Sequence, residues 1–200
     1  MEPFLLIGEH VALEPLLVEH VEELVVAATE DRATYDWTLV PGDLAGMAEY
    51  VDNLLAERDK ERTVPFVQRR LLDGQLVGCT RYLDIRSWSG RDAPDEAEVG
   101  GTWLAASAQR TPINTEAKLL MFTHAFEVWN VNRLALATDA RNERSRVAIE
   151  RVGARFEGVL RRHRWSYAPG ERGQPRDTAI FSIIPSEWPD VKARLQARLA

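Results

Sequence analysis

The chain has 200 residues, of which 45% are hydrophobic and 28% are charged. A chain of this length and composition can bury most of its apolar surface in one α/β core, so we expect a single domain over residues 1–200. Its formal net charge of -6 argues against duplex nucleic acid or an anionic membrane as the main partner, because both bind through a basic face. A neutral or cationic amine suits an acidic protein better.

Cys79 is the single cysteine of the sequence. One cysteine excludes an intramolecular disulfide and a cysteine-rich zinc site, and this usage is typical of a reducing compartment. The first ten residues hold a short apolar run without a basic lead or a cleavage motif. We therefore expect a cytoplasmic protein that binds no metal.

The first half of the chain alternates strand and helix patterns. A strand with alternating apolar residues precedes a helical stripe, and Asp43 is placed to cap a second helix. Three further strands follow, the first two of them joined by an Asp-Gly turn. The predicted strands span 10–17, 64–70, 75–85 and 97–105, the helices span 18–29 and 44–61, and a flexible loop spans 86–96.

The second half reads as helix, strand, helix, two strands and a last helix. Asn114 or Thr115 is expected to cap the first of these helices. The predicted helices span 115–129 and 143–152, and a final helix carries Trp188 and Val191; the strands span 133–138, 156–167 and 177–184, with a turn at 169–173.

The junction between the strand 97–105 and the helix after it has the form of an anion site. Free backbone N–H groups and the positive end of the helix dipole both point at whatever binds there. Any strand-to-helix turn shares this form, so the junction alone does not separate a phosphate site from a plain connection.

Four runs of sequence together carry a more specific signal, and their order resembles the GNAT acetyltransferase superfamily. Within it, the chain is most similar to the ribosomal-protein N-terminal acetyltransferase branch. The resemblance implies an α/β (α+β) fold with a mixed, strongly twisted seven-stranded sheet flanked by helices, splayed fourth and fifth strands and an extra C-terminal helix. The four runs are 98–104, 109–118, 138–145 and 149–154.

The same resemblance implies acetyl-coenzyme A as cosubstrate, with its pyrophosphate on the loop before the third helix. Proline and asparagine occupy the two glycine positions of the family's loop, at Pro112 and Asn114. Proline has no N–H to donate, so one phosphate contact is lost. The implied cofactor contacts are Trp103, Leu104, Gln109, Arg110, Ile113, Asn114, Thr115, Glu116, Asn142 and Ser145.

Attack of an amine on a thioester needs a base, an oxyanion donor and an acid for the thiolate. The resemblance implies Glu98 as base, although a solvent-facing strand glutamate is the alternative. Ile149 stands where the family often has a tyrosine that acts as the acid for the thiolate, so the resemblance implies Ser145 as that acid. Asn142 is implied as a contact to the pantetheine arm, and it is equally a good helix N-cap.

The base assignment has a competitor. Arg164 occupies the position of a second acidic residue of that branch, and His163 beside it is an alternative base or a structural hydrogen-bonding residue. Tyr35, Trp37 and Trp88 fall in segments that border the acceptor cleft of this fold, where they would form an aromatic wall or pack in the core.

Together these features predict transfer of an acetyl group to a primary amine, either a protein N-terminus or a small molecule. The apolar helices and the Trp-bearing tail suggest a homodimer. Two alternatives stay open: a catalytically impaired binding or regulatory protein, supported by Pro112 and Ile149, and an enzyme that accepts a longer acyl group.

Overall fold

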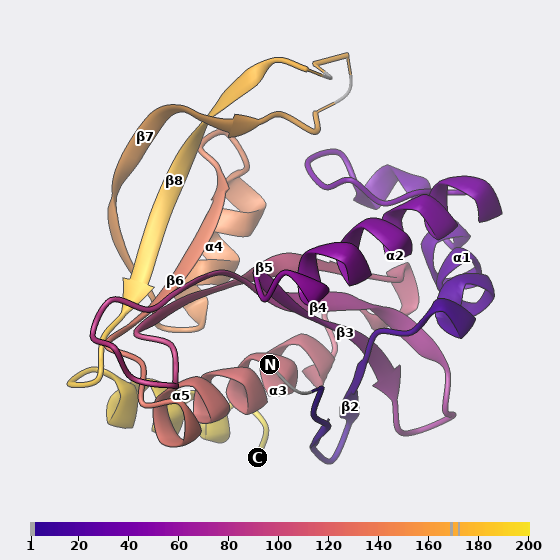
Figure 1. Ribbon diagram of the computed structural model, residues 1–200. Coiled ribbons are helices and arrows are strands. Elements are labelled where there is room, and N and C mark those ends of the chain that lie inside the picture. The colour runs from indigo at the N-terminus through magenta and orange to yellow at the C-terminus, as the bar shows by residue number, and fades with distance from the viewer. Residues whose placement is uncertain (1–2, 169, 172) are drawn as a thin grey trace.

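The computed structural model describes residues 3–168, 170–171 and 173–200, and these form a mixed sheet with helices on both faces (Figure 1). The eight strands lie in the order β1-β2-β3-β4-β5-β6-β8-β7. Their bounds are β1 Leu6–Ile7, β2 Val11–Pro15, β3 Thr63–Arg70, β4 Leu76–Arg86, β5 Glu96–Leu104, β6 Arg133–Asp139, β7 Arg155–Trp165 and β8 Pro175–Ile183. The main helices are α1 Val21–Thr29, α2 Leu44–Asp59, α3 Pro112–Thr123, α4 Glu143–Arg151 and α5 Trp188–Ala197.

This architecture confirms the predicted fold class, with one strand more than expected. The additional strand, β1, has two residues and pairs antiparallel with β2. Two residues are too few to show a hydrophobic period, which is why the sequence pattern missed it. The predicted turn at 169–173 includes positions 169 and 172, which lie outside the described residues.

Two of the predicted helices differ from the observed ones by more than their last two residues. The segment expected to be helical over 18–29 divides into a short 3-10 turn, η1 Val18–His20, and α1. The helix expected over 115–129 begins three residues earlier, at Pro112, and after Thr123 it continues as a π-helical segment, η4 His124–Val128. Asp43 caps α2 as predicted, because its side chain accepts from the N–H of Gly46 at 2.9 Å.

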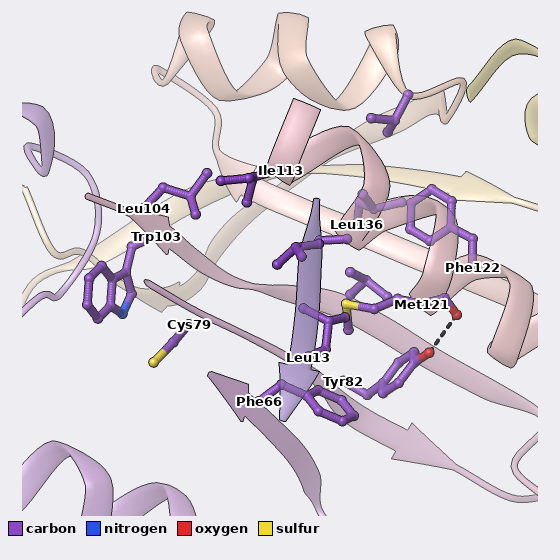
Figure 2. Close-up of a cluster of buried hydrophobic side chains, with 14 of the residues drawn as sticks. Leu13, Phe66, Cys79, Tyr82, Trp103, Leu104, Ile113, Met121, Phe122 and Leu136 are labelled. Carbon is purple, nitrogen blue, oxygen red and sulfur yellow. Dashed lines mark hydrogen bonds between the residues drawn. The ribbon is translucent and has the colours of Figure 1, made fainter. Parts of the chain in front are cut away.

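A cluster of buried side chains fastens α3 to the sheet, and Figure 2 shows part of it. Tyr82 on β4, which is fully buried, donates its hydroxyl hydrogen to the carbonyl oxygen of Met121 on α3 at 2.5 Å (Figure 2). Burial raises the pKa of Tyr82 well above its usual value, so the phenol stays a donor. The helix is thereby held at a fixed position behind β5.

Trp188 packs inside the molecule. Its ring stacks on Phe126 with centroids 5.2 Å apart, and its indole N–H donates to Glu127 at 2.8 Å. These contacts bind α5 to the end of the third helix. The Trp-bearing tail therefore no longer supports the expected homodimer, since this tryptophan is buried within its own chain.

Candidate active site

The sheet opens between β5 and β6. These strands run parallel and pair only over 96–98 with 133–135. Beyond that point β5 continues to Leu104 beside β4, whereas β6 continues to Asp139 beside β8, so the two strands diverge as predicted (Figure 1). Backbone groups on the facing edges have no ladder partner across the gap, and they are available to a ligand.

A β-bulge re-aims the backbone of β5 at this opening. Arg81 pairs with Gly100 and Cys79 pairs with Trp103, so two residues of β5 oppose one residue of β4. Gly101 within the bulge has φ +57°, and a Cβ there would lie 2.4 Å from the guanidinium carbon of Arg81. Glycine is therefore required at this position, both for backbone conformation and for space.

Lys118 supports the bulge from the α3 side. Its ammonium donates to the hydroxyl of Thr102 at 2.7 Å and to that of Thr80 at 3.3 Å, and it is buried. Burial lowers the pKa of Lys118 to about 7. Sequence reasoning missed this residue; the available signal was a lysine between Ala117 and Met121, which share the buried side of the helix.

The loop that enters α3 differs from the predicted arrangement. Thr111, not Asn114 or Thr115, is the N-cap, and its hydroxyl accepts from the N–H of Ile113 at 3.4 Å. Pro112 is the first helical residue, where a missing N–H breaks no intrahelical bond. The proline is therefore compatible with a regular helix N-terminus, and the amide of Asn114 remains in the first turn.

Gln109 and Arg110 begin this loop. The Gln109 side chain donates to the Leu104 carbonyl at 3.0 Å and accepts from Arg144 of α4 at 3.3 Å, which joins the loop to the opposite wall of the opening. Arg110 has φ +60° and an exposed side chain. Two arginines thus lie beside the positive end of α3, a favourable place for phosphate.

Glu116 has a different role from the predicted contact with a cofactor. Its buried carboxylate accepts from the backbone N–H groups of Glu9, His10 and Val11 at 2.8, 2.7 and 2.9 Å. Gly8 packs so closely that an added Cβ would lie 2.2 Å from the carboxyl carbon. Glu116 holds the turn between β1 and β2 against α3, and its oxygens are engaged there.

Trp103 and Leu104 end β5 as buried residues. The Leu104 carbonyl also accepts from the Tyr35 hydroxyl at 3.1 Å, and the Tyr35 ring meets the edge of Trp103 with centroids 5.9 Å apart. Tyr35 is therefore a core residue. Trp88, in contrast, is 59% exposed in the loop after β4.

Glu98 is buried and paired with Arg164. The guanidinium donates to both carboxylate oxygens, at 2.9 and 2.6 Å, and also to Asp84 at 2.5 Å. Hydrogen bonding to Glu98 raises the pKa of Arg164 above its ordinary value. Glu98 thus lies beside the opening, with both of its side-chain oxygens bonded by the Arg164 guanidinium.

The remaining predicted catalytic residues are dispersed. Asn142 is the N-cap of α4 and accepts from the N–H of Ser145 at 3.0 Å, which places the serine in the first turn of that helix. Ile149 is buried one turn later. His163 is exposed on β7 and lines a separate shallow hollow with Val159 and other β7 residues. Burial of part of its ring lowers the pKa of His163.

A pocket of about 500 Å³ lies on the α2 side of β4. Leu83, which lines this pocket, and the Glu98 carboxylate both lie beside Gly100. Asp84 of the pocket wall accepts a hydrogen bond from Arg164. The pocket therefore adjoins the Glu98 pair. Its lining is Leu54, Glu57, Arg62, Thr63, Arg81, Leu83, Asp84, Ile85 and Arg86.

Arg141 joins three segments at one end of the opening. It donates to Asp139 on β6 and to Glu171 beyond β7, both at 2.8 Å, and its guanidinium lies 5.0 Å from the ring centre of Trp37. Trp37 belongs to the loop between α1 and α2. We call this contact the Arg141 junction.

Among the residues that the structure describes, no group of three His, Cys, Asp or Glu side chains could hold a metal ion. None of the described helices has the length and apolar character needed to cross a bilayer.

Comparison with known proteins agrees with this geometry. The sequence pattern of the family described as Acetyltransferase (GNAT) domain matches residues 10–155. The Bacillus subtilis protein named "Putative ribosomal N-acetyltransferase YdaF" is 25% identical over 187 residues, covering 91% of this chain and 95% of that protein. A GCN5-related N-acetyltransferase from Brucella melitensis has 30% identity and a TM-score of 0.85, covering 100% of this chain and 87% of that one.

Mycobacterium smegmatis RimJ, solved in complex with CoA-disulfide, has the same fold at 23% identity and a TM-score of 0.75, covering 94% of this chain and 88% of that chain.

Proposed function

This chain belongs to the GNAT acetyltransferase family, and from that premise we propose that it transfers an acetyl group directly from acetyl-coenzyme A to a primary amine, on a protein N-terminus or on a small molecule. The observation that carries the proposal is the unpaired edge of β5, with its bulge at Gly101, facing the start of α3. The names of the Bacillus and Mycobacterium relatives support a coenzyme A ligand and an amine acceptor.

The residues around the opening fit a phosphorylated cosubstrate. Arg110 and Arg144 flank the N-terminus of α3, where the helix dipole and the Asn114 amide also favour an anion. Gly101 lets backbone approach a ligand more closely than any side chain would allow. When bound, acetyl-coenzyme A supplies an activated thioester carbonyl. We assign the phosphates to these two arginines and the carbonyl to the bulge.

Glu98 and Ser145 are the groups we assign to proton transfer. Glu98 receives the proton of the acceptor ammonium, and to do so its carboxylate exchanges one hydrogen bond from Arg164 for one from the amine. Ser145, in the first turn of α4, supplies a hydroxyl on the other side of the opening. The amine enters from the 500 Å³ pocket, because Asp84 of that pocket adjoins the Glu98 pair.

The test combines binding with turnover. Calorimetric titration with acetyl-coenzyme A should show binding, and acetyl transfer to amine acceptors should follow by release of free thiol. Glu98→Gln should lower kcat and leave the affinity for acetyl-coenzyme A nearly intact, whereas Glu150→Gln, on the exposed side of α4, should change neither. Absence of binding at millimolar acetyl-coenzyme A would overturn the proposal.

A non-catalytic binding protein is the second candidate, favoured by the aliphatic Ile149 at the family's tyrosine position. Tight binding of acetyl-coenzyme A without transfer to any acceptor would select it. We retain the cytoplasm as the proposed location, on the ground of the single, buried cysteine.

A further inference from the structure

The Arg176 side chain on β8 has no hydrogen-bond acceptor for its Nε among the residues that the structure describes. Its Nε is buried and makes no hydrogen bond with any described residue, and its outer nitrogens likewise form no ion pair within that part of the chain. The hydroxyl oxygen of Thr178, two residues along the strand, is also buried and unpartnered. Buried polar groups without a partner are rare enough to require an explanation.

The position of Arg176 in the sheet places it on the acceptor side. Residues Ala179, Phe181 and Ile183 of β8 point into the core beneath α3 and α5. Because side chains alternate along a strand, Arg176 and Thr178 project from the opposite face. That face carries the Glu98 carboxylate as well, since Arg164, the cross-strand partner of Arg176, reaches Glu98 from it.

The carboxylates around Arg176 act on it from a distance, and none of the described ones forms an ion pair with it. Arg164 lies directly opposite on β7, and two like charges at such a position destabilise a sheet. Glu98 and Asp84 are engaged by Arg164, and Asp139 on β6 is engaged by Arg141. Burial lowers the pKa of Arg176 below its ordinary value, and the opposing charge of Asp139 offsets only part of that effect.

We propose that Arg176 is an anion subsite for the acceptor, so that the amine acetylated by this protein belongs to a molecule with a carboxylate or phosphate group near that amine. This inference rests on the proposed acetyl transfer for the reacting end of the ligand. The anion accepts hydrogen bonds from the Arg176 guanidinium. The amine then lies near Arg164, the cross-strand neighbour of Arg176, and near Glu98, which Arg164 bonds. An acidic protein with net charge -6 can select an anionic acceptor here because the local charge, not the total, acts at contact distance.

Matched peptide pairs test the subsite. Ser-Asp-Phe amide and Ser-Asn-Phe amide differ in one carboxylate, and Ser-phosphoserine-Phe amide and Ser-Ser-Phe amide differ in one phosphate. The wild-type protein should prefer an acidic member by about tenfold to a hundredfold in kcat/KM, the factor expected for a charge-assisted hydrogen bond. Arg176→Gln should reduce that preference to about onefold by raising KM for the acidic peptide, with the neutral peptide unaffected.

Arg161→Gln is the matched control, because Arg161 is an exposed arginine on the neighbouring strand β7. It removes the same charge and should keep the preference. Thermal melting separates a ligand role from a structural one: Arg176→Gln should melt at the same temperature or higher, since it relieves the repulsion with Arg164. A fall in melting temperature together with an unchanged acid-to-amide ratio would overturn the inference.

Direct binding of the acidic peptides, measured by calorimetry, keeps this result distinct from the proposed function. Transfer to both members of each pair at equal rates would retain the acetyltransferase and reject the subsite. Conversely, binding of an acidic peptide that Arg176→Gln weakens by tenfold or more, without any transfer, would support the subsite and reject acetyl transfer.

Discussion

The carboxylate of Glu98 on β5 bonds the guanidinium of Arg164 on β7, although β6 and β8 lie between these strands in the sheet. A pair across two intervening strands requires strong twisting of this half of the sheet. It also ties β7 to β5, with which β7 shares no backbone ladder. The proposed base is thereby held by a residue 66 positions away in the sequence.

Removing either partner of this pair should destabilise the fold. Arg164→Gln leaves the buried Glu98 without its main donor, and Glu98→Gln leaves the guanidinium with Asp84 alone. We expect each to lower the free energy of unfolding by about 1 to 3 kcal/mol, less than for a fully buried pair because Arg164 is partly exposed. Urea denaturation measures this change.

The double variant provides the control. If the residues interact directly, the loss in the double variant should be smaller than the sum of the single losses. Strict additivity would mean that the pair adds nothing to stability.

Lys118 should make stability depend on pH. Its pKa is about 7 in the folded protein and roughly 10.4 in an unfolded chain, so between these values the unfolded state binds more protons. Stability therefore rises with pH across this window, and the full cost of the buried cation is present below pH 7. The free energy of unfolding of Lys118→Met relative to wild type should therefore fall by about 2 to 4 kcal/mol between pH 7 and pH 10.

Guanidinium denaturation at both pH values gives that difference. Lys60→Met, at an exposed lysine, should show no such change in the same window. A constant difference between Lys118→Met and wild type would show that the ammonium is not desolvated.

Glu116→Gln should loosen the N-terminal turn. A carboxamide has one acceptor oxygen, and its NH₂ group would face a backbone donor, so at least one of the three N–H bonds is lost. We expect a loss of about 2 kcal/mol in the free energy of unfolding. Hydrogen exchange at residues 9–11 should accelerate, and the affinity for acetyl-coenzyme A should stay the same; a large drop in that affinity would restore the cofactor role first predicted for Glu116.

Pro112→Gly should strengthen binding of acetyl-coenzyme A. The substitution adds an N–H at the first position of α3, where it needs no intrahelical partner and can bond a phosphate. Up to about tenfold tighter binding is expected from one such bond. Calorimetry measures it, and Pro185→Gly, before α5, should leave binding unchanged. Unaltered affinity in Pro112→Gly would mean that the phosphates lie elsewhere.

Much of the fold could be predicted because its signals are local. The stripe of α2, the Asp43 cap and the alternation of β6 follow from neighbouring residues. β1 was missed because it is too short to show a period. The predicted start of α3 was wrong because Pro112 was compared with a glycine of the family's loop. The first turn of a helix accepts proline readily.

The candidate site was predictable only where a single segment defines it. Asn142 as N-cap of α4 needs no distant partner. The partners of Glu98 and Glu116 come from segments 66 and more than 100 residues away, so no spacing in the sequence indicated them. Lys118 is unusual only because it is buried, and Arg176 only because its Nε is buried without a partner; a sequence does not state which charges are enclosed.

The Arg141 junction restricts how the loops of this protein can vary. One guanidinium meets the end of β6, the segment after β7 and the loop before α2, so each of them is anchored by the other two. An insertion in any one of these segments would pull its contact away from the shared arginine. Changes in loop length should therefore be tolerated only where they leave Trp37 and Glu171 in contact with Arg141. Selection should act on the three segments together.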